Sequence, residues 1–221
     1  IIDGLSGARI TAARRRGKYL LCDLDTGGIL MMHLRMSGRV LVVSQGTARP
    51  PHTHVVMHLS PDDHGARHEM WFVDPRTFGE VVVFDAADES RVAPELAKLG
   101  PDPIVDGLDE AKLAEILRGR RGNLKAFLLD QHRIAGIGNI YADEALWRSK
   151  LHFEQPGSSL SRNQVLALLG EVTDVLAAAV EVGGTSFDDL YIDVNGESGY
   201  YEISLKAYGR EGEPCARCKK R

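Results

Sequence analysis

The pattern of hydrophobic and polar positions changes once along this 221-residue chain, near residue 90. Before that point, short runs of β-type residues alternate with turns rich in Gly, Pro and Asp, which is typical of antiparallel strands. Strands are predicted at 19–24, 29–34, 40–43, 54–59, 69–73 and 80–84. This half is therefore predicted to form an antiparallel β-sandwich or barrel, of which we favour the sandwich.

The second half shows helical periodicity instead. Helices are predicted at 109–118, 123–130, 139–149 and 162–182. Ser161 and Gln164 have the spacing of a capping box at the start of the last helix, and Gly183-Gly184 ends it. No run is judged long enough to span a membrane. Together the two halves predict an α+β fold.

A glycine-rich turn, Gly136-Ile137-Gly138, leads directly into the helix predicted at 139–149. Asn139 is a residue type preferred at helix N-caps, and the free N–H groups of a first helical turn attract anions. An apolar face before the turn can hold it rigidly: Leu124, Phe127, Leu128 and Leu129. A nucleic-acid phosphate would suit this site, and an ordinary helix hairpin is the alternative.

The charge distribution supports a phosphate-binding surface more than the net charge does. The net charge of −4 argues against a generic basic nucleic-acid binder. Basic residues nevertheless form three runs, within 9–18, 118–125 and 206–221, while acidic residues gather within 85–115. Each run alone could be a solvated face, but three runs and the glycine turn favour one phosphate-facing surface.

Two predicted turns of the β half contain residues that turns seldom favour. They are HLRMSG at 33–38 and DPRTFG at 74–79. Met36, Arg76 and Phe78 could project from the tips of neighbouring hairpins. Exposed Met and Phe beside Arg are typical of proteins that push apolar side chains between base pairs to kink a duplex, or that fill the gap left by an extruded base. The alternative is that Met36 and Phe78 fold back to close the core.

Three histidines share one strand parity, as a metal site would require: His52, His54 and His58. The opposite parity is apolar and is interpreted as the core face: Val55, Met57 and Leu59. We therefore expect these histidines to face solvent rather than a metal.

The cysteines fall into two classes. Cys22 lies within an apolar strand and is interpreted as a buried small hydrophobic residue. Cys215 and Cys218 have the spacing of one knuckle of a four-ligand zinc site. A redox pair is the alternative, but no thioredoxin-like βαβ pattern surrounds them.

Several motifs, in order along essentially the whole chain, resemble those of bacterial formamidopyrimidine-DNA glycosylase, whose sister family is endonuclease VIII. The matching segments are RGKYL at 16–20, HLRMSG at 33–38, DPRTFG at 74–79, GIGNIYADEALW at 136–147, GGTSF at 183–187 and YGREGEPC at 208–215, followed by Cys218. Each motif is weak alone, but together they are specific.

The resemblance implies roles for individual residues. Met36, Arg76 and Phe78 match the triad that fills the void and contacts the orphaned base. Lys18 matches the proton donor for β-elimination, although a plain phosphate contact remains an alternative. Further DNA-binding positions implied by the matching segments are His33, His52, Arg120, Gly138, Asn139 and Tyr208.

The resemblance also implies a mobile loop, a zinc site and a domain organisation. The segment 193–201 resembles the loop that closes over the extruded base, with Asn195, Gly196, Gly199 and Tyr200 as its implied site residues. Cys215 and Cys218 would supply half of a site for one zinc ion. The expected domains are a β-sandwich (1–92), a helix-two-turns-helix domain (93–203) and the start of a zinc β-ribbon (204–221).

The implied activity is base-excision repair. The family removes 8-oxoguanine and formamidopyrimidines through a Schiff base and then cuts the abasic strand by β,δ-elimination. Its nucleophile is an N-terminal proline followed by glutamate, and an α-amine suits this role because its pKa of about 7.7–8.0 leaves a neutral fraction. This sequence begins Ile1-Ile2-Asp3. We therefore expect a piece of a longer enzyme that is inactive alone and binds zinc weakly or not at all.

The expected partner is damaged double-stranded DNA, with no membrane association. The expected protein is monomeric, cytoplasmic, bacterial and associated with the nucleoid. Two other functions stay open at this point. One is a noncatalytic damaged-DNA-binding homologue, and the other is a small-molecule enzyme built from a sandwich and helices.

Overall fold

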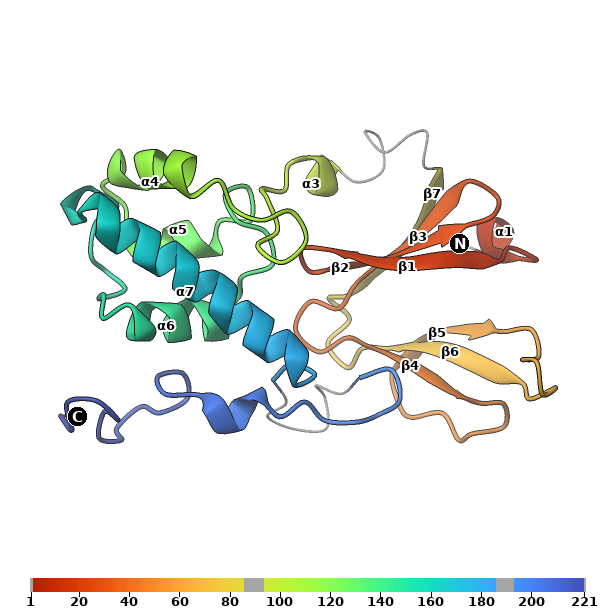
Figure 1. Cartoon of the computed structure of the whole chain (residues 1–221). Coiled ribbons are helices and arrows are strands. Elements are labelled where there is room, and N and C mark those ends of the chain that lie inside the picture. Colours follow the sequence, from red (N-terminus) through yellow and green to blue (C-terminus); the bar gives the residue numbers. More distant parts are fainter. Residues whose placement is uncertain (1, 86–93, 186–192, 221) are drawn as a thin grey trace. The chain divides into compact units, whose positions relative to one another are not determined.

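The computed structural model describes residues 2–85, 94–185 and 193–220 (Figure 1). The chain divides into two compact units, residues 1–92 with 183–202 and residues 93–182 with 203–221. The expected domain boundary at 92/93 lies outside the described residues, as do Ser186 and Phe187 of the GGTSF segment. The predicted α+β class is confirmed, because the first unit contains two antiparallel sheets and the second is helical.

The first unit is a sandwich of a four-stranded and a three-stranded sheet. The first sheet has the order β1 (Ile10–Arg16), β2 (Tyr19–Leu24), β3 (Gly28–His33) and β7 (Glu80–Asp85). The second has the order β4 (Arg39–Ser44), β6 (His68–Val73) and β5 (Thr53–His58). All six predicted strands are confirmed, with no end displaced by more than one residue.

Strand β1 and the short helix α1 (Ile2–Leu5) were not predicted. Strand β1 pairs with β2 from Ile10 to Arg16, but none of its residues is buried. A strand without a buried face has no alternation of polar and apolar residues. This stretch was therefore recognised only as a run of basic residues and not as a strand.

The core of the sandwich combines side chains from both sheets. Its buried members are Cys22, Leu30, Met32, Val40, Met70 and Phe72, and Val55, Met57 and Leu59 pack against them. The predicted core face of β5 is therefore confirmed, and the three histidines of the opposite parity are exposed. Cys22 is buried as expected, and burial raises the pKa of its thiol.

The second unit contains the four predicted helices and a short helix, α3 (Pro94–Ala97). The predicted ones are α4 (Glu110–Arg118), α5 (Leu124–Leu129), α6 (Asn139–Arg148) and α7 (Arg162–Glu181). The 3-10 turn η2 (Gly157–Ser159) lies between α6 and α7. A second one, η3 (Tyr201–Ser204), begins in the segment 183–202 of the first unit and ends in the segment 203–221 of the second. The predicted Ser161–Gln164 capping box is present at the start of α7.

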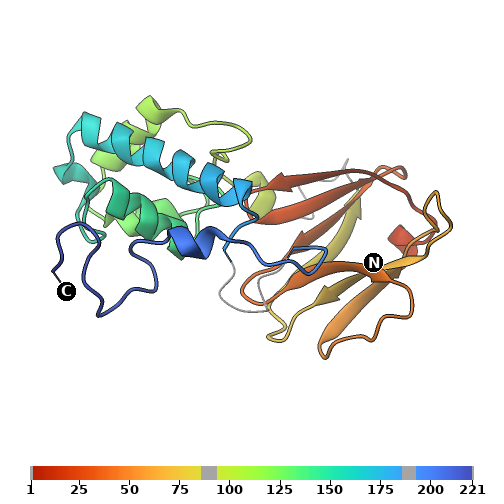
Figure 2. The same cartoon turned by 60° about the horizontal axis from the view of Figure 1, so that its bottom comes forward.

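Helix α7 is the central helix of this unit, with α4 and α6 packed against it (Figure 2). By length and composition alone it could cross a membrane, so the judgement that no run is long enough was too strict. Its buried residues recur at helical spacing, as in the core helix of a globular unit: Val165, Leu168, Leu169, Val172, Val175, Leu176 and Ala179.

A buried glutamate fastens the C-terminal segment to α6. Glu144 is 1% exposed, and its carboxylate accepts hydrogen bonds from the backbone N–H groups of Lys206 (3.0 Å), Ala207 (2.8 Å) and Tyr208 (3.0 Å). These amides belong to neither a helix nor a strand, so the side chain supplies the partners that regular structure would otherwise provide.

We predict that Glu144→Gln lowers the free energy of unfolding by about 1–3 kcal/mol, because the new amide NH2 would face backbone donors. The control is Glu171→Gln, which removes only a half-exposed ion pair to Arg148 at 3.8 Å and should change stability by less than about 0.5 kcal/mol. Urea unfolding followed by circular dichroism measures both. Equal effects would show that the Glu144 bonds add nothing.

Candidate nucleic-acid interface

The loops 34–38 and 74–79 of the first unit carry exposed apolar side chains. Met36 is 54% exposed and Phe78 is 57% exposed. The Arg76 guanidinium lies 5.2 Å from the centre of the Phe78 ring, within the range of a cation–π contact. The alternative in which Met36 and Phe78 close the core is therefore wrong.

A buried carboxylate, Asp74, organises both loops. Its Oδ1 accepts hydrogen bonds from the Ser37 hydroxyl (2.6 Å) and the Arg76 N–H (3.2 Å), and its Oδ2 accepts one from the Gly79 N–H (2.6 Å). Burial opposes ionisation of Asp74, but the bonds from Ser37, Gly79, Arg76 and Phe78 outweigh it and lower the pKa of this carboxyl group. The loop that carries Met36 is thus tied to the loop that carries Arg76 and Phe78.

Three residues other than glycine near these positions have left-handed backbone conformations. They are Arg35 (φ 52°), His52 (φ 65°) and Thr77 (φ 56°). Each precedes, follows or is itself an expected DNA-contacting residue, and such strain concentrates at functional sites. His52 is exposed, and its carbonyl accepts the Asp74 N–H at 3.0 Å, so its loop joins the same cluster.

The glycine after Phe78 has no room for a side chain. A Cβ on Gly79 would lie 2.5 Å from the Phe72 ring and 3.0 Å from Asp74 Oδ2. Glycine therefore lets the loop close tightly onto the buried carboxylate.

His33 and Lys18, both in the first unit, differ in burial. His33 is buried, its Nδ1 accepts the Arg35 N–H at 2.9 Å, and its ring meets Tyr19 edge-on at 4.5 Å. Lys18 is exposed in the turn between β1 and β2. Surrounding protein atoms lower the pKa of its ammonium group, but its exposure means that water screens much of this effect.

In the second unit, a buried framework holds the turn before α6. Ile134, Ala135 and Ile137 are fully buried. The Gln131 amide donates to the carbonyls of Leu129 (3.0 Å) and Ile137 (2.9 Å), and its oxygen accepts the Gly136 N–H at 3.0 Å. Gly136 has φ 93°, a conformation that glycine adopts easily.

The predicted N-cap at Asn139 is wrong by one residue. Gly138 is the N-cap, with an extended backbone (φ −115°, ψ −179°), and Asn139 is the first residue of α6. The carbonyl of Gly138 accepts the first intrahelical bond, from Ala142 N–H at 3.0 Å. The amides of Asn139 and Ile140 come before that bond, so the positive helix end remains suited to an anion, with the Asn139 side chain exposed beside it.

The segment 193–200 forms a turn in the first unit. Asp193 Oδ1 accepts the N–H groups of Asn195 (2.8 Å) and Glu197 (2.9 Å), and Gly196 has φ 86°. The Val42 N–H donates to the Val194 carbonyl at 2.8 Å, which attaches the turn to β4.

The end of this segment is closely packed. Gly199 lies against the backbone of Gly183 and Gly184, where a side chain would not fit. Tyr200 beside it is exposed.

The remaining predicted residues lie in the second unit. Arg120 is exposed between α4 and α5, and Tyr208 is half-buried with its N–H on Glu144. Hydrogen bonds from the N–H groups of Cys218 and Arg217 lower the pKa of the Cys215 thiol to about 6. Among the described residues, no group of three or more His, Cys, Asp or Glu side chains gathers in a way that could hold a metal.

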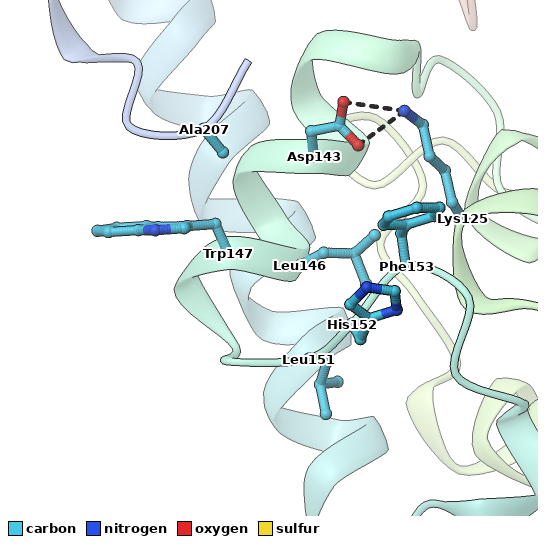
Figure 3. Close-up of a pocket in the computed structure, with 8 residues that line it drawn as sticks. All are labelled: Lys125, Asp143, Leu146, Trp147, Leu151, His152, Phe153 and Ala207. Carbon is cyan, nitrogen blue, oxygen red and sulfur yellow. Dashed lines mark hydrogen bonds and ion pairs between the residues drawn. The ribbon is translucent and has the colours of Figure 1, made fainter. Parts of the chain in front are cut away.

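An open cavity of about 390 Å³ lies in the second unit, apart from the predicted site residues. Figure 3 shows the Lys125 ammonium reaching the Asp143 carboxylate (2.8 Å and 2.9 Å) at one side of it. Phe153 and His152, whose rings stack at 4.5 Å, lie beside Leu146. The ion pair satisfies the charged groups, and the other walls are mainly apolar.

Sequence reasoning missed the polar residues that support the site. Asp74 follows a buried strand and precedes Pro75, and Gln131 lies between two apolar helical segments. Both positions are polar next to apolar runs, which is the signal that could have identified them. Their partners, however, are set by the fold.

Two family models match the chain. The formamidopyrimidine-DNA glycosylase N-terminal domain matches residues 1–81, and the formamidopyrimidine-DNA glycosylase H2TH domain matches residues 99–190.

Curated relatives agree with these matches. A formamidopyrimidine-DNA glycosylase of Thermobifida fusca (strain YX) is 48% identical over 220 residues, covering 97% of this chain and 74% of the relative. One from Mycobacterium avium (strain 104) is 46% identical over 217 residues, with the same two coverages.

Solved structures share the fold. The Lactococcus lactis Fpg in complex with DNA containing an abasic site has a TM-score of 0.88 and 31% identity, covering 99% of this chain and 78% of that one. The MutM (Fpg) protein of Thermus thermophilus has a TM-score of 0.85 and 36% identity, covering 97% and 76%. The chain therefore belongs to the formamidopyrimidine-DNA glycosylase family, the DNA glycosylases and abasic-site lyases of base-excision repair.

Proposed function

We propose that this chain recognises oxidised purines in duplex DNA by inserting Met36 and Phe78 where the damaged nucleotide has left the stack. The observation that carries the proposal is the exposure of these two side chains on loops fastened to one buried carboxylate. An extruded base leaves a gap that costs stacking energy, and apolar side chains inserted there recover part of it.

Arg76 would contact the orphaned base opposite the lesion. Its guanidinium already lies against the Phe78 ring, so the two side chains would enter the duplex together. A planar guanidinium can donate hydrogen bonds to base edges while its face stays on the aromatic ring.

The second unit would hold the DNA backbone. A phosphate would bind the amides at the start of α6, with Gly138 and Asn139 at its side. Arg120 and Tyr208 in this unit, and His52 in the first, would add further contacts. His33 is buried and would support the Met36 loop from beneath.

Lys18 would donate the proton in the elimination that cuts the abasic strand. Its ammonium group carries the proton that such an elimination requires. Because Lys18 is exposed, it can reach a substrate atom outside the protein.

The loop around Asn195, Gly196, Gly199 and Tyr200 would close over the extruded base. Cys215 and Cys218 would supply two ligands of a zinc site, for which two thiols at this spacing fit one knuckle. The ion would act structurally by holding a β-ribbon together. We also propose a monomer that acts on DNA in the bacterial cytoplasm, at the nucleoid.

The first test is damage recognition by the chain itself. The wild-type chain should bind a duplex with an abasic-site analogue opposite dC about tenfold or more tightly than the undamaged duplex. Fluorescence anisotropy at fixed salt measures both dissociation constants. Equal constants would overturn the proposed function.

The second test concerns the wedge. Phe78→Ala should weaken binding to the damaged duplex about tenfold, since stacking of a base on an aromatic ring is worth about 1–3 kcal/mol. Phe153→Ala is the matched control, because Phe153 is also exposed (46%) but is not a proposed contact. Equal losses for the two variants would exclude the wedge.

The third test concerns the phosphate site. Asn139→Asp should weaken binding to damaged and undamaged duplexes alike, by about tenfold at low salt, because a carboxylate would repel the phosphate at α6. Asn163→Asp makes the same charge change on an exposed residue in the first turn of α7. If both variants lose the same affinity, the effect is general charge repulsion and no phosphate binds at α6.

A further inference from the structure

Asp74 lies where the two connections between the sheets come together. The 34–38 loop links β3 of the first sheet to β4 of the second, and the 74–79 loop returns from β6 to β7. The Ser37–Asp74 bond joins these two crossings over 37 residues of sequence. Both loops belong to the first unit, so their arrangement is set within one compact body.

The backbone of Asp74 adds a third segment to the cluster. Its N–H donates to the His52 carbonyl at 3.0 Å, and its own carbonyl lies 2.8 Å from His54 Nε2 and accepts the Thr77 N–H at 3.3 Å. One residue, only 1% exposed, therefore touches every loop of this unit that holds one of the expected DNA contacts Met36, His52, Arg76 and Phe78.

We infer that Asp74 is a positioning residue for damage recognition, whose carboxylate holds Met36, Arg76 and Phe78 as one preformed wedge. The inference rests on the proposed function of that wedge. Side chains that are ordered before binding lose less entropy when they enter the duplex, so a fastened wedge binds more tightly than the same side chains on loose loops.

The acceptor requirement is specific to a carboxylate. Asp74 uses both oxygens, Oδ1 for Ser37 and Arg76 and Oδ2 for Gly79. An asparagine of the same shape has one acceptor oxygen, and its NH2 group cannot accept from a backbone N–H. The Ser37 hydroxyl can rotate to adapt, but the Arg76 and Gly79 amides cannot, so Asp74→Asn loosens the chain on one side of Phe78.

The test is a double-mutant cycle read on the damaged duplex. Asp74→Asn should reduce the preference for the abasic-analogue duplex over the undamaged one by about fivefold or more. In the Phe78→Ala background, the same change should alter that preference less than about twofold, because its effect passes through Phe78. Effects that multiply in the double variant would show that Asp74 acts elsewhere and would overturn the inference.

A spectroscopic readout separates positioning from affinity. With 2-aminopurine opposite the abasic analogue, saturating wild-type protein should raise the fluorescence as the orphaned base is unstacked. Saturating Asp74→Asn should give a smaller rise, and an equal rise would contradict the inference. Asp62→Asn is the matched control, because Asp62 accepts the His64 and Ala66 amides (both 2.9 Å) in the loop at the opposite end of β6. It should behave as the wild type.

A milder variant keeps the test decisive if Asp74→Asn does not fold. Ser37→Ala removes one donor and leaves the Gly79 and Arg76 bonds. It should lower the damage preference in the same direction by a smaller factor, and this effect should fall away in the Met36→Ala background, because Ser37 fastens the loop that carries Met36. A Ser37→Ala variant with unchanged preference would count against the inference. If the wild type itself shows no preference for damage, the proposed function fails. If only the Asp74 and Ser37 results fail, Met36 and Phe78 still form the wedge, but the hydrogen bonds of Asp74 do not position it.

Discussion

A buried carboxylate with several backbone donors is the constraint on which the recognition surface depends. The loops of a sandwich have no ladder of hydrogen bonds, so each buried N–H in them needs another partner. Asp74 accepts the N–H groups of Arg76 and Gly79 in one crossing between the sheets and the Ser37 hydroxyl in the other. Because these bonds are made inside the protein, Met36 and Phe78 can remain outside it without the loops collapsing onto the core.

In the second unit, other residues supply hydrogen-bond partners to the backbone of irregular segments. Gln131 uses its amide oxygen and its NH2 group to hold the turn before α6, and Glu144 holds three consecutive amides near the C-terminal end. In each case, a polar side chain within or beside a buried region supplies the hydrogen-bond partners that backbone groups would otherwise find in regular secondary structure. The DNA contacts proposed for this chain lie on irregular segments that these side chains support. The segments are the loops 34–38 and 74–79, the turn 136–138 before α6, and the residues around Tyr208.

The regular elements could be predicted because burial imposes a period on the sequence. Six strands and four helices have that period, whereas β1 does not, since both of its faces are exposed. The start of α6 at Asn139 was predicted correctly, but its N-cap was assigned to Asn139 instead of Gly138, because residue preference favours Asn over Gly while the turn puts Gly138 in the extended conformation. Motifs identified the loops that carry Met36 and Phe78, but the direction of those side chains depends on Ser37 and Asp74, which are distant in sequence. No local pattern encodes such a pairing.

The hydrogen bonds of Asp74 imply that the wedge exists before DNA binds and enters the duplex unchanged. A crystal structure of the chain with a duplex that carries an abasic-site analogue would show whether this holds. We expect the Phe78 ring between base pairs at the damaged site, with the Ser37 and Gly79 bonds to Asp74 intact. Loops that have rearranged with those bonds broken, or a Phe78 ring that lies against protein while the DNA stays stacked, would contradict it.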